Sequence, residues 1–226
     1  MFPGASFAHS YLGMSSSAPL VETPPRQLQY AAIRDRVEDA DIFLFRGTIL
    51  FSRIIEEVSH GAYSHCAIAA NWSERKMLLQ AELMGGVQAV PLSVAAGTYN
   101  GRVDWYKIAP EWRAKLDIPA LLAEARADLG LTYATSELLR VAAHSLFGAK
   151  LPQDCDNPHA LFCSQYVERC FRKAGLPLCP QSSDVGTSPS QIAASEVLRF
   201  QGVIAHDPNI VPDRSADAIG ARLPAR

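Results

Sequence analysis

The chain has 226 residues, of which 48% are hydrophobic, and its 21 Lys and Arg residues against 23 Asp and Glu residues give a formal net charge of -2. A chain of this length and composition can bury a substantial core. Its charges are spread without long blocks, so nothing indicates a polyanionic partner such as nucleic acid. Peptides, other small molecules and lipids remain open as substrates.

The five cysteines occur at spacings that include no C-x-x-C pair, which argues against a zinc knuckle and against a disulfide framework. The N-terminus lacks the basic and unbroken apolar regions of a signal peptide, and no segment reaches the roughly 18 apolar residues of a membrane span. We therefore expect a soluble cytoplasmic protein with no integral membrane segment, no metal and no other cofactor.

Composition divides the chain into three parts. Residues 1–36 are rich in Ser, Pro and Ala and show weak periodicity, which predicts a poorly ordered N-terminal extension. Residues 37–205 carry the periodic segments and are expected to form one domain. Residues 206–226 are polar and contain proline, as is typical of a C-terminal surface tail.

Short apolar runs separated by turn residues predict a series of strands. They cover residues 41–47, 64–70, 77–84, 87–92 and 102–109, with a helix predicted over 49–59. The polar loop NWSERK joins the second of these strands to the third. Because most of the strands follow one another directly, we expect an antiparallel sheet.

The later part of the chain predicts helices. Residues 117–129 begin with a capping Asp and a Pro, and residues 136–148 give a second helical pattern. The strongest pattern begins at Cys163, where CSQYVERCFRKAGLP is amphipathic at helical spacing and stops at Gly175. Strands in one block and helices in another indicate an α+β fold.

Cys163 is the best candidate for a nucleophile. We expect it at the N-terminal end of its helix, where unpaired N–H groups and the helix dipole stabilise a thiolate. The alternative is a buried cysteine that acts as a small hydrophobic residue. Cys170, seven residues later on the same helix face, is assigned to that packing role.

His65 and Glu82 are expected to share one face of a hairpin. If the strands pair symmetrically about NWSERK, opposed residue numbers sum to 147 and His65 faces Glu82, close enough for the carboxylate to orient the imidazole. A one-residue slip would undo this pairing, and Asp41 and Gln80 are then the next candidates. Cys66 is expected to point to the other side of the strand. The alternatives are a core or edge histidine and a solvated carboxylate.

Six sequence blocks, in order over about residues 39–195, resemble the circularly permuted, NlpC-like branch of papain-fold cysteine hydrolases. They are DADIFLFRG, YSHCAIAA, LLQAELMGGVQAVPL, GLTY, FCSQYVERCFRKAGL and TSPSQIA. The resemblance implies a papain-like antiparallel sheet or barrel packed against helices, with the nucleophile at a helix N-terminus. Matched block by block, it also implies a triad of His65, Glu82 and Cys163. Tyr133 is similar to a tyrosine near the active-site floor, which implies a substrate-binding role, although Ala134 departs from the acidic residue often found there.

These residues predict a cysteine hydrolase. Cys163 would attack an acyl carbon, His65 would transfer protons, Glu82 would orient the imidazole, and a thioester would form as intermediate. The resemblance implies amide substrates, either peptides or muropeptides of the cell-wall type. A lipid acyl hydrolase or acyltransferase, and a non-catalytic binding module, remain alternatives.

Overall fold

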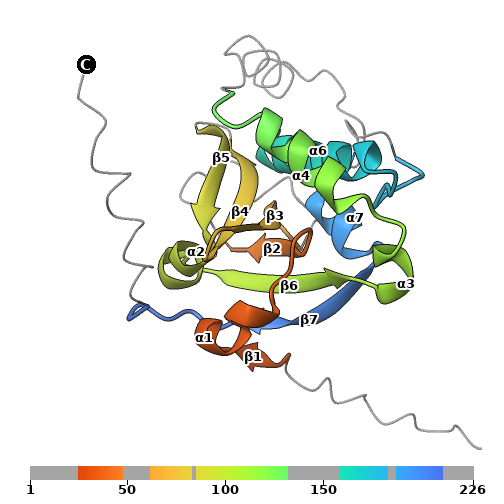
Figure 1. Cartoon of the computed structure of the whole chain (residues 1–226). Coiled ribbons are helices and arrows are strands. Elements are labelled where there is room, and N and C mark those ends of the chain that lie inside the picture. Colours follow the sequence, from red (N-terminus) through yellow and green to blue (C-terminus); the bar gives the residue numbers. More distant parts are fainter. Residues whose placement is uncertain (1–24, 48–61, 83–84, 132–157, 183–186, 211–226) are drawn as a thin grey trace, which may run out of the picture.

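The structure is a computed structural model that describes residues 25–47, 62–82, 85–131, 158–182 and 187–210 (Figure 1). Within these ranges, seven strands form one open sheet with the order β1-β7-β6-β2-β3-β4-β5. The strands are β1 (Gln27–Leu28), β2 (Ile42–Arg46), β3 (His65–Trp72), β4 (Arg75–Glu82), β5 (Gly86–Pro91), β6 (Arg102–Ile108) and β7 (Leu198–Ile204). Neighbouring strands are antiparallel, except that β1 and β7 run parallel.

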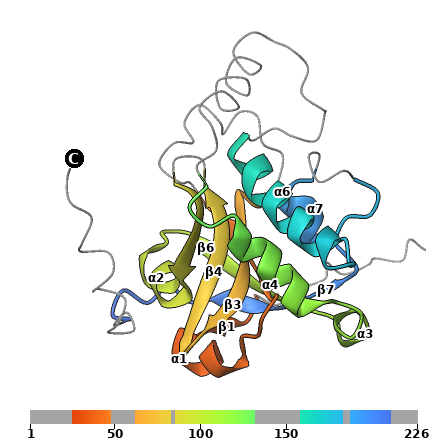
Figure 2. The ribbon, with the colours of Figure 1, turned by 45° about the horizontal axis from the view of Figure 1, so that its top comes forward.

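Helices cover both faces of this sheet (Figure 2). The helices are α1 (Tyr30–Ile33), the 3-10 helix η1 (Arg34–Arg36), α2 (Leu92–Thr98), α3 (Pro110–Arg113), α4 (Ile118–Ala127), α6 (Pro158–Lys173) and α7 (Pro189–Ala193). Residues of α4, α6 and α7 share one buried cluster with one face of the sheet, while α1 and α2 pack on the other. The predicted α+β class is therefore confirmed.

The central strand β2 shows why its sequence is a continuous apolar run. Ile42 and Leu44 belong to the cluster beneath α4 and α6, whereas Phe43 and Phe45 belong to the cluster beneath α1 and α2. Successive side chains of a strand point to opposite faces, so a strand covered on both sides needs apolar residues at every position.

The strands predicted in the first half lie within two residues of those in the structure at both ends. The predicted hairpin register is also confirmed, because pairs such as Ile68 with Leu79 and Ala69 with Leu78 sum to 147. The predicted helices over 49–59 and 136–148 lie outside the described residues, as does Tyr133.

Helix α6 begins at Pro158, five residues earlier than predicted. Proline is favoured in the first turn of a helix, where its missing N–H has no partner to lose. The prediction that Cys163 opens the helix is therefore wrong, since Cys163 lies in the second turn. The predicted end is confirmed: Gly175 has a φ of +80°, and Leu176 N–H donates to the carbonyl oxygen of Phe171, closing the helix as in a Schellman motif.

Residues 27–36, which the sequence assigns to the poorly ordered extension, form three elements of the fold. β1 pairs with β7, and Leu28, Tyr30 and Ile33 are buried. Gly202 of β7 permits this close approach, because a Cβ at that position would lie only 2.6 Å from Leu28 Cδ1. The sequence pattern did not predict β1, because a strand of two residues is too short to show the alternation of apolar and polar residues.

We expect removal of residues 1–36 to lower the thermal unfolding midpoint strongly. Burial of Leu28 and Ile33 stabilises the fold by about 1.5–3 kcal/mol each, and the deletion also removes the hydrogen bonds between β1 and β7. Removal of residues 1–24 is the matched control, since it deletes none of these contacts. Equal midpoints for the two truncated proteins, measured by circular dichroism, would contradict the packing of this segment.

Candidate active site

His65 opens strand β3 and is almost fully buried, with 8% of its surface exposed. It pairs with Phe45 of β2, and the two ring centroids lie 5.2 Å apart. Its Nε2 atom lies 2.9 Å from Oε1 of Gln80, on the neighbouring strand β4. The imidazole is therefore held on one side by a ring contact and on the other by an amide.

Gln80, rather than Glu82, makes the direct contact with His65. Glu82 lies two residues along β4 on the same face, and its Oε1 accepts a hydrogen bond of 2.7 Å from Gln80 Nε2. The predicted register brings Glu82 near His65, but the amide of Gln80 stands between them. The sequence did contain a signal for Gln80, because the register that opposes His65 to Glu82 also makes Gln80 a diagonal neighbour.

This chain of contacts fixes the proton position on the imidazole. The NH2 group of Gln80 donates to Glu82 Oε1, so Oε1 of the amide is turned toward His65. Because an amide oxygen is only an acceptor, Nε2 of His65 must carry a proton. Nδ1 is then the nitrogen of a neutral imidazole that can take a proton from another group.

That group is Cys163, which is completely buried in the second turn of α6. Its thiol forms side-chain hydrogen bonds with both His65 and Cys66. Cys66 lies on the other side of β3 from the residues in register with His65, as expected, but this is the side that carries Cys163, so Cys66 is not remote from the thiol. Helix α6 packs over β3, and at the start of that strand the thiol reaches two successive residues.

The pKa of Cys163 is lowered, whereas the pKa values of His65 and Cys66 are raised. Burial raises the pKa of Cys163, but hydrogen bonds from Cys66 and His65 and the charge of His65 bring it well below its usual value. Burial lowers the pKa of His65, but the charge and hydrogen bond of Cys163 and the contact with Gln80 raise it above its usual value. Burial raises the pKa of Cys66, which stays a thiol and donates to Cys163. The lowered pKa of Cys163 and the raised pKa of His65 both favour the thiolate–imidazolium form of the pair.

Asp41, the other alternative partner of His65, has a different role. Its Oδ2 accepts hydrogen bonds from Trp105 Nε1 at 2.9 Å and from the Glu38 backbone N–H at 3.0 Å. Burial raises its pKa to about 6. Asp41 therefore anchors the start of β2 and does not orient the imidazole.

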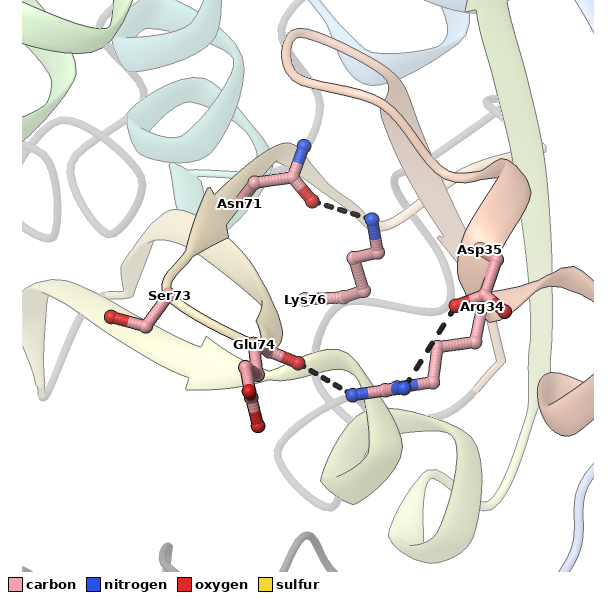
Figure 3. A pocket seen from close by; sticks show the side chains of 6 residues that line it. All are labelled: Arg34, Asp35, Asn71, Ser73, Glu74 and Lys76. Carbon is pink, nitrogen blue, oxygen red and sulfur yellow. Dashed lines mark hydrogen bonds and ion pairs between the residues drawn. The ribbon is translucent and has the colours of Figure 1, made fainter.

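A separate polar pocket of about 280 Å³ lies at the turn between β3 and β4, at the other end of the hairpin from His65 (Figure 3). Its lining residues are Arg34, Asp35, Asn71, Ser73, Glu74 and Lys76. Lys76 Nζ donates to Asn71 Oδ1 and to the Val37 carbonyl, and Arg34 Nη2 donates to the Glu74 carbonyl. Arg34 and Lys76 thus donate hydrogen bonds that hold the β3–β4 turn and the segment before β2. We therefore place the candidate active site at His65 and Cys163.

No known protein family and no curated protein matches this chain. Among solved structures, it is similar to the crystal structure of the metalloprotein YiiX from Escherichia coli O157:H7, DUF1105. The sequence identity is 17%, the TM-score is 0.46, and the match covers 75% of this chain and 97% of YiiX.

The predicted membership of the NlpC-like branch is wrong, because the structural match found is to a protein of a different family, DUF1105. The six blocks that carried the resemblance are short. Their order reflects the order of strands and helices along the chain, which unrelated families can share.

The described part of the chain contains no group of three or more His, Cys, Asp or Glu side chains placed to hold a metal ion. Among its helices, none is both long and apolar enough to cross a membrane.

Proposed function

We propose that this protein is a cysteine hydrolase that cleaves an amide bond, with Cys163 as nucleophile and His65 as acid and base. The single observation that carries the proposal is the contact of a Cys163 thiol of lowered pKa with an imidazole whose other nitrogen is held by Gln80. An amide as the third member of such a group is known among cysteine proteases.

The geometry supports a reaction in two steps. The Cys163 thiolate attacks the acyl carbon, a carbon–sulfur bond forms, and His65 gives its Nδ1 proton to the leaving amine as the carbon–nitrogen bond breaks. Water then attacks the thioester. His65 takes a proton from that water, the acid leaves, and the thiolate–imidazolium pair is restored.

Gln80 and Glu82 act on this reaction through His65. The hydrogen bond from His65 Nε2–H to Gln80 Oε1 keeps Nδ1 directed at sulfur. It also stabilises the imidazolium, because the amide oxygen accepts the proton on Nε2. Glu82 keeps the amide of Gln80 in the required orientation. Both are therefore positioning residues in the proposed mechanism.

The proposal is tested by alkylation with iodoacetamide at about pH 7, where an ordinary thiol of pKa about 8.5 is mostly protonated. We expect Cys163 to react before Cys170 and Cys179, because burial raises the pKa of each of those thiols to about 12. The sites are identified by peptide mass spectrometry. Since Cys163 and Cys170 are equally buried on one helix, protection by the fold affects both.

A Cys163 that reacts no faster than Cys170 would refute the activated nucleophile and favour a non-catalytic binding module. Incubation with peptides, muropeptides and phospholipids then distinguishes amide hydrolysis from transfer or hydrolysis of lipid acyl groups. We expect Cys163-dependent products from the peptide or muropeptide arm.

A further inference from the structure

Two arginines lie side by side at the ends of β2 and β6. Arg46 pairs directly with Arg102, and two residues earlier Leu44 pairs with Asp104 of β6 and with Cys66 of β3. Opposed residues share a face, as do residues two apart on one strand. Both arginines therefore lie on the face of the sheet that carries Cys66. They form the last pair between β2 and β6, two residues beyond the pair of Leu44 with Asp104.

This register places the arginines near the Cys163 thiol. Neighbouring strands lie about 4.8 Å apart, so Asp104 and Cys66, on either side of β2, are separated by about 10 Å. Cys66 contacts Cys163 directly. Measured along the sheet, the arginine pair thus lies on the order of 10 Å from the residue that contacts the reacting sulfur.

One buried carboxylate holds both guanidinium groups. Arg102 donates from Nε to Oδ1 of Asp104 at 2.6 Å and from Nη2 to Oδ2 at 3.0 Å, and Arg46 Nε lies 3.5 Å from Oδ2. Asp104 is completely buried. Like charges on directly opposed residues destabilise a sheet. Asp104 offsets this repulsion, but two cations and one anion leave one positive charge.

Tyr63 ties this cluster to the segment that carries His65. Its hydroxyl donates to Asp104 Oδ2 at 2.7 Å and accepts from Arg46 Nη2 at 2.8 Å, and the Arg46 Cζ atom lies 4.2 Å from the centre of its ring. Tyr63 precedes His65 by two residues. The same short segment therefore contacts the Arg46 guanidinium and carries the imidazole.

Each arginine has a donor group that the described residues do not use. Their contacts with the described residues use Nε and Nη2 but not Nη1. The side chains of Arg46 and Arg102 remain 37% and 35% exposed. A planar guanidinium with unused N–H groups matches a carboxylate or a phosphate.

We propose that Arg46 and Arg102 form an anion-recognition subsite, so that the acyl substrate carries a carboxylate or phosphate about 10 Å from the bond that is cleaved. This inference rests on the proposed function, because it assigns a substrate class to the same active site. The positive charge would hold the anionic end of the substrate while Cys163 attacks the acyl carbon.

A pair of alkylating reagents tests the subsite. N-iodoacetyl-glycylglycine carries a carboxylate roughly 10 Å from its reactive carbon when extended, and its C-terminal amide is the neutral twin. We expect the acid to alkylate Cys163 faster than the amide, and we expect added NaCl to lower this ratio. In Arg46→Gln and in Arg102→Gln, the ratio should fall by about fivefold or more, as for loss of a charged hydrogen bond.

Two variants and two competing anions complete the design. Arg46→Lys keeps the charge without the planar fork and should lose only part of the ratio. Lys173→Gln, at the exposed end of α6, removes the same charge elsewhere and should leave the ratio unchanged. Inorganic phosphate and acetate, added as competitors, show which anion the subsite prefers by how strongly each slows the acid reagent.

The outcomes separate this inference from the proposed function. One outcome is that the neutral reagent modifies Cys163 before Cys170 while the acid-to-amide rate ratio is the same in the native chain, Arg46→Gln and Arg102→Gln. That result would contradict the anion subsite and leave Cys163 as the nucleophile. If neither reagent selects Cys163 over Cys170, the proposed function fails and the subsite fails with it. The NaCl series uses the native chain, so an acid-to-amide ratio near one that does not change with NaCl would contradict the subsite even if a variant does not fold.

Discussion

Replacing Cys163 by alanine is expected to abolish turnover of every substrate that the native protein cleaves, because no thioester can form. The fold should persist. Loss of one buried sulfur resembles loss of one buried methylene group and should cost about 1 kcal/mol of unfolding free energy. Product formation by mass spectrometry and unfolding in urea measure the two effects separately.

Cys170→Ala is the matched control for this prediction. Cys170 lies on the same helix, is equally buried and has a pKa raised to about 12. Its replacement should cost similar stability and leave turnover intact. Residual turnover in Cys163→Ala, or equal losses in both variants, would assign the chemistry to another residue or the loss to the fold.

Replacing His65 by alanine is expected to shift the pH profile of Cys163 alkylation upward by roughly 1–3 pH units, the usual effect of removing a nearby opposite charge. Burial, which raises the pKa of Cys163, would then be opposed mainly by the hydrogen bond from Cys66. Because a depressed pKa keeps the thiolate down to low pH, raising it means that alkylation stops at a higher pH as the solution is acidified. Rates measured across a pH series report this shift.

Variants of strand β4 should give a graded series in the same assay. Gln80→Leu removes the direct partner of His65, so it should shift the profile more than Glu82→Gln, which leaves the amide in place. His206→Ala changes an exposed histidine outside the site and is the control. A larger shift in Glu82→Gln than in Gln80→Leu would show that Glu82 acts on the imidazole directly.

The sequence alone was sufficient to predict the central hairpin. The loop NWSERK is symmetrical between two apolar runs, and a two-residue side-chain period allows few registers that bury one face. Both the pairing sum of 147 and the shared face of His65 and Glu82 follow from that constraint. The choice between Glu82 and Gln80 depends on side-chain reach across the strands, which the register does not determine.

Other features depend on tertiary contacts that leave little local trace. β1 is only two residues long and is formed through its pairing with β7, near the other end of the chain. The start of α6 at Pro158 moves Cys163 away from the free N–H groups of the first turn, so its lowered pKa arises from His65 and Cys66 instead. Cys66 shares the buried cluster beneath α6 with Cys163, as strand alternation allows, but the sequence does not show that α6 covers that face of β3.

The sheet order has a consequence for engineering this protein. β1 is four strand positions away from β3, a span of about 19 Å at 4.8 Å per position. Free-energy changes at sites more than about 10 Å apart usually add. Substitutions that strengthen the pairing of β1 with β7 should therefore raise the stability of a Cys163 or His65 variant by the same amount as in the native chain, which makes that edge a suitable place to compensate for destabilising changes at the thiol.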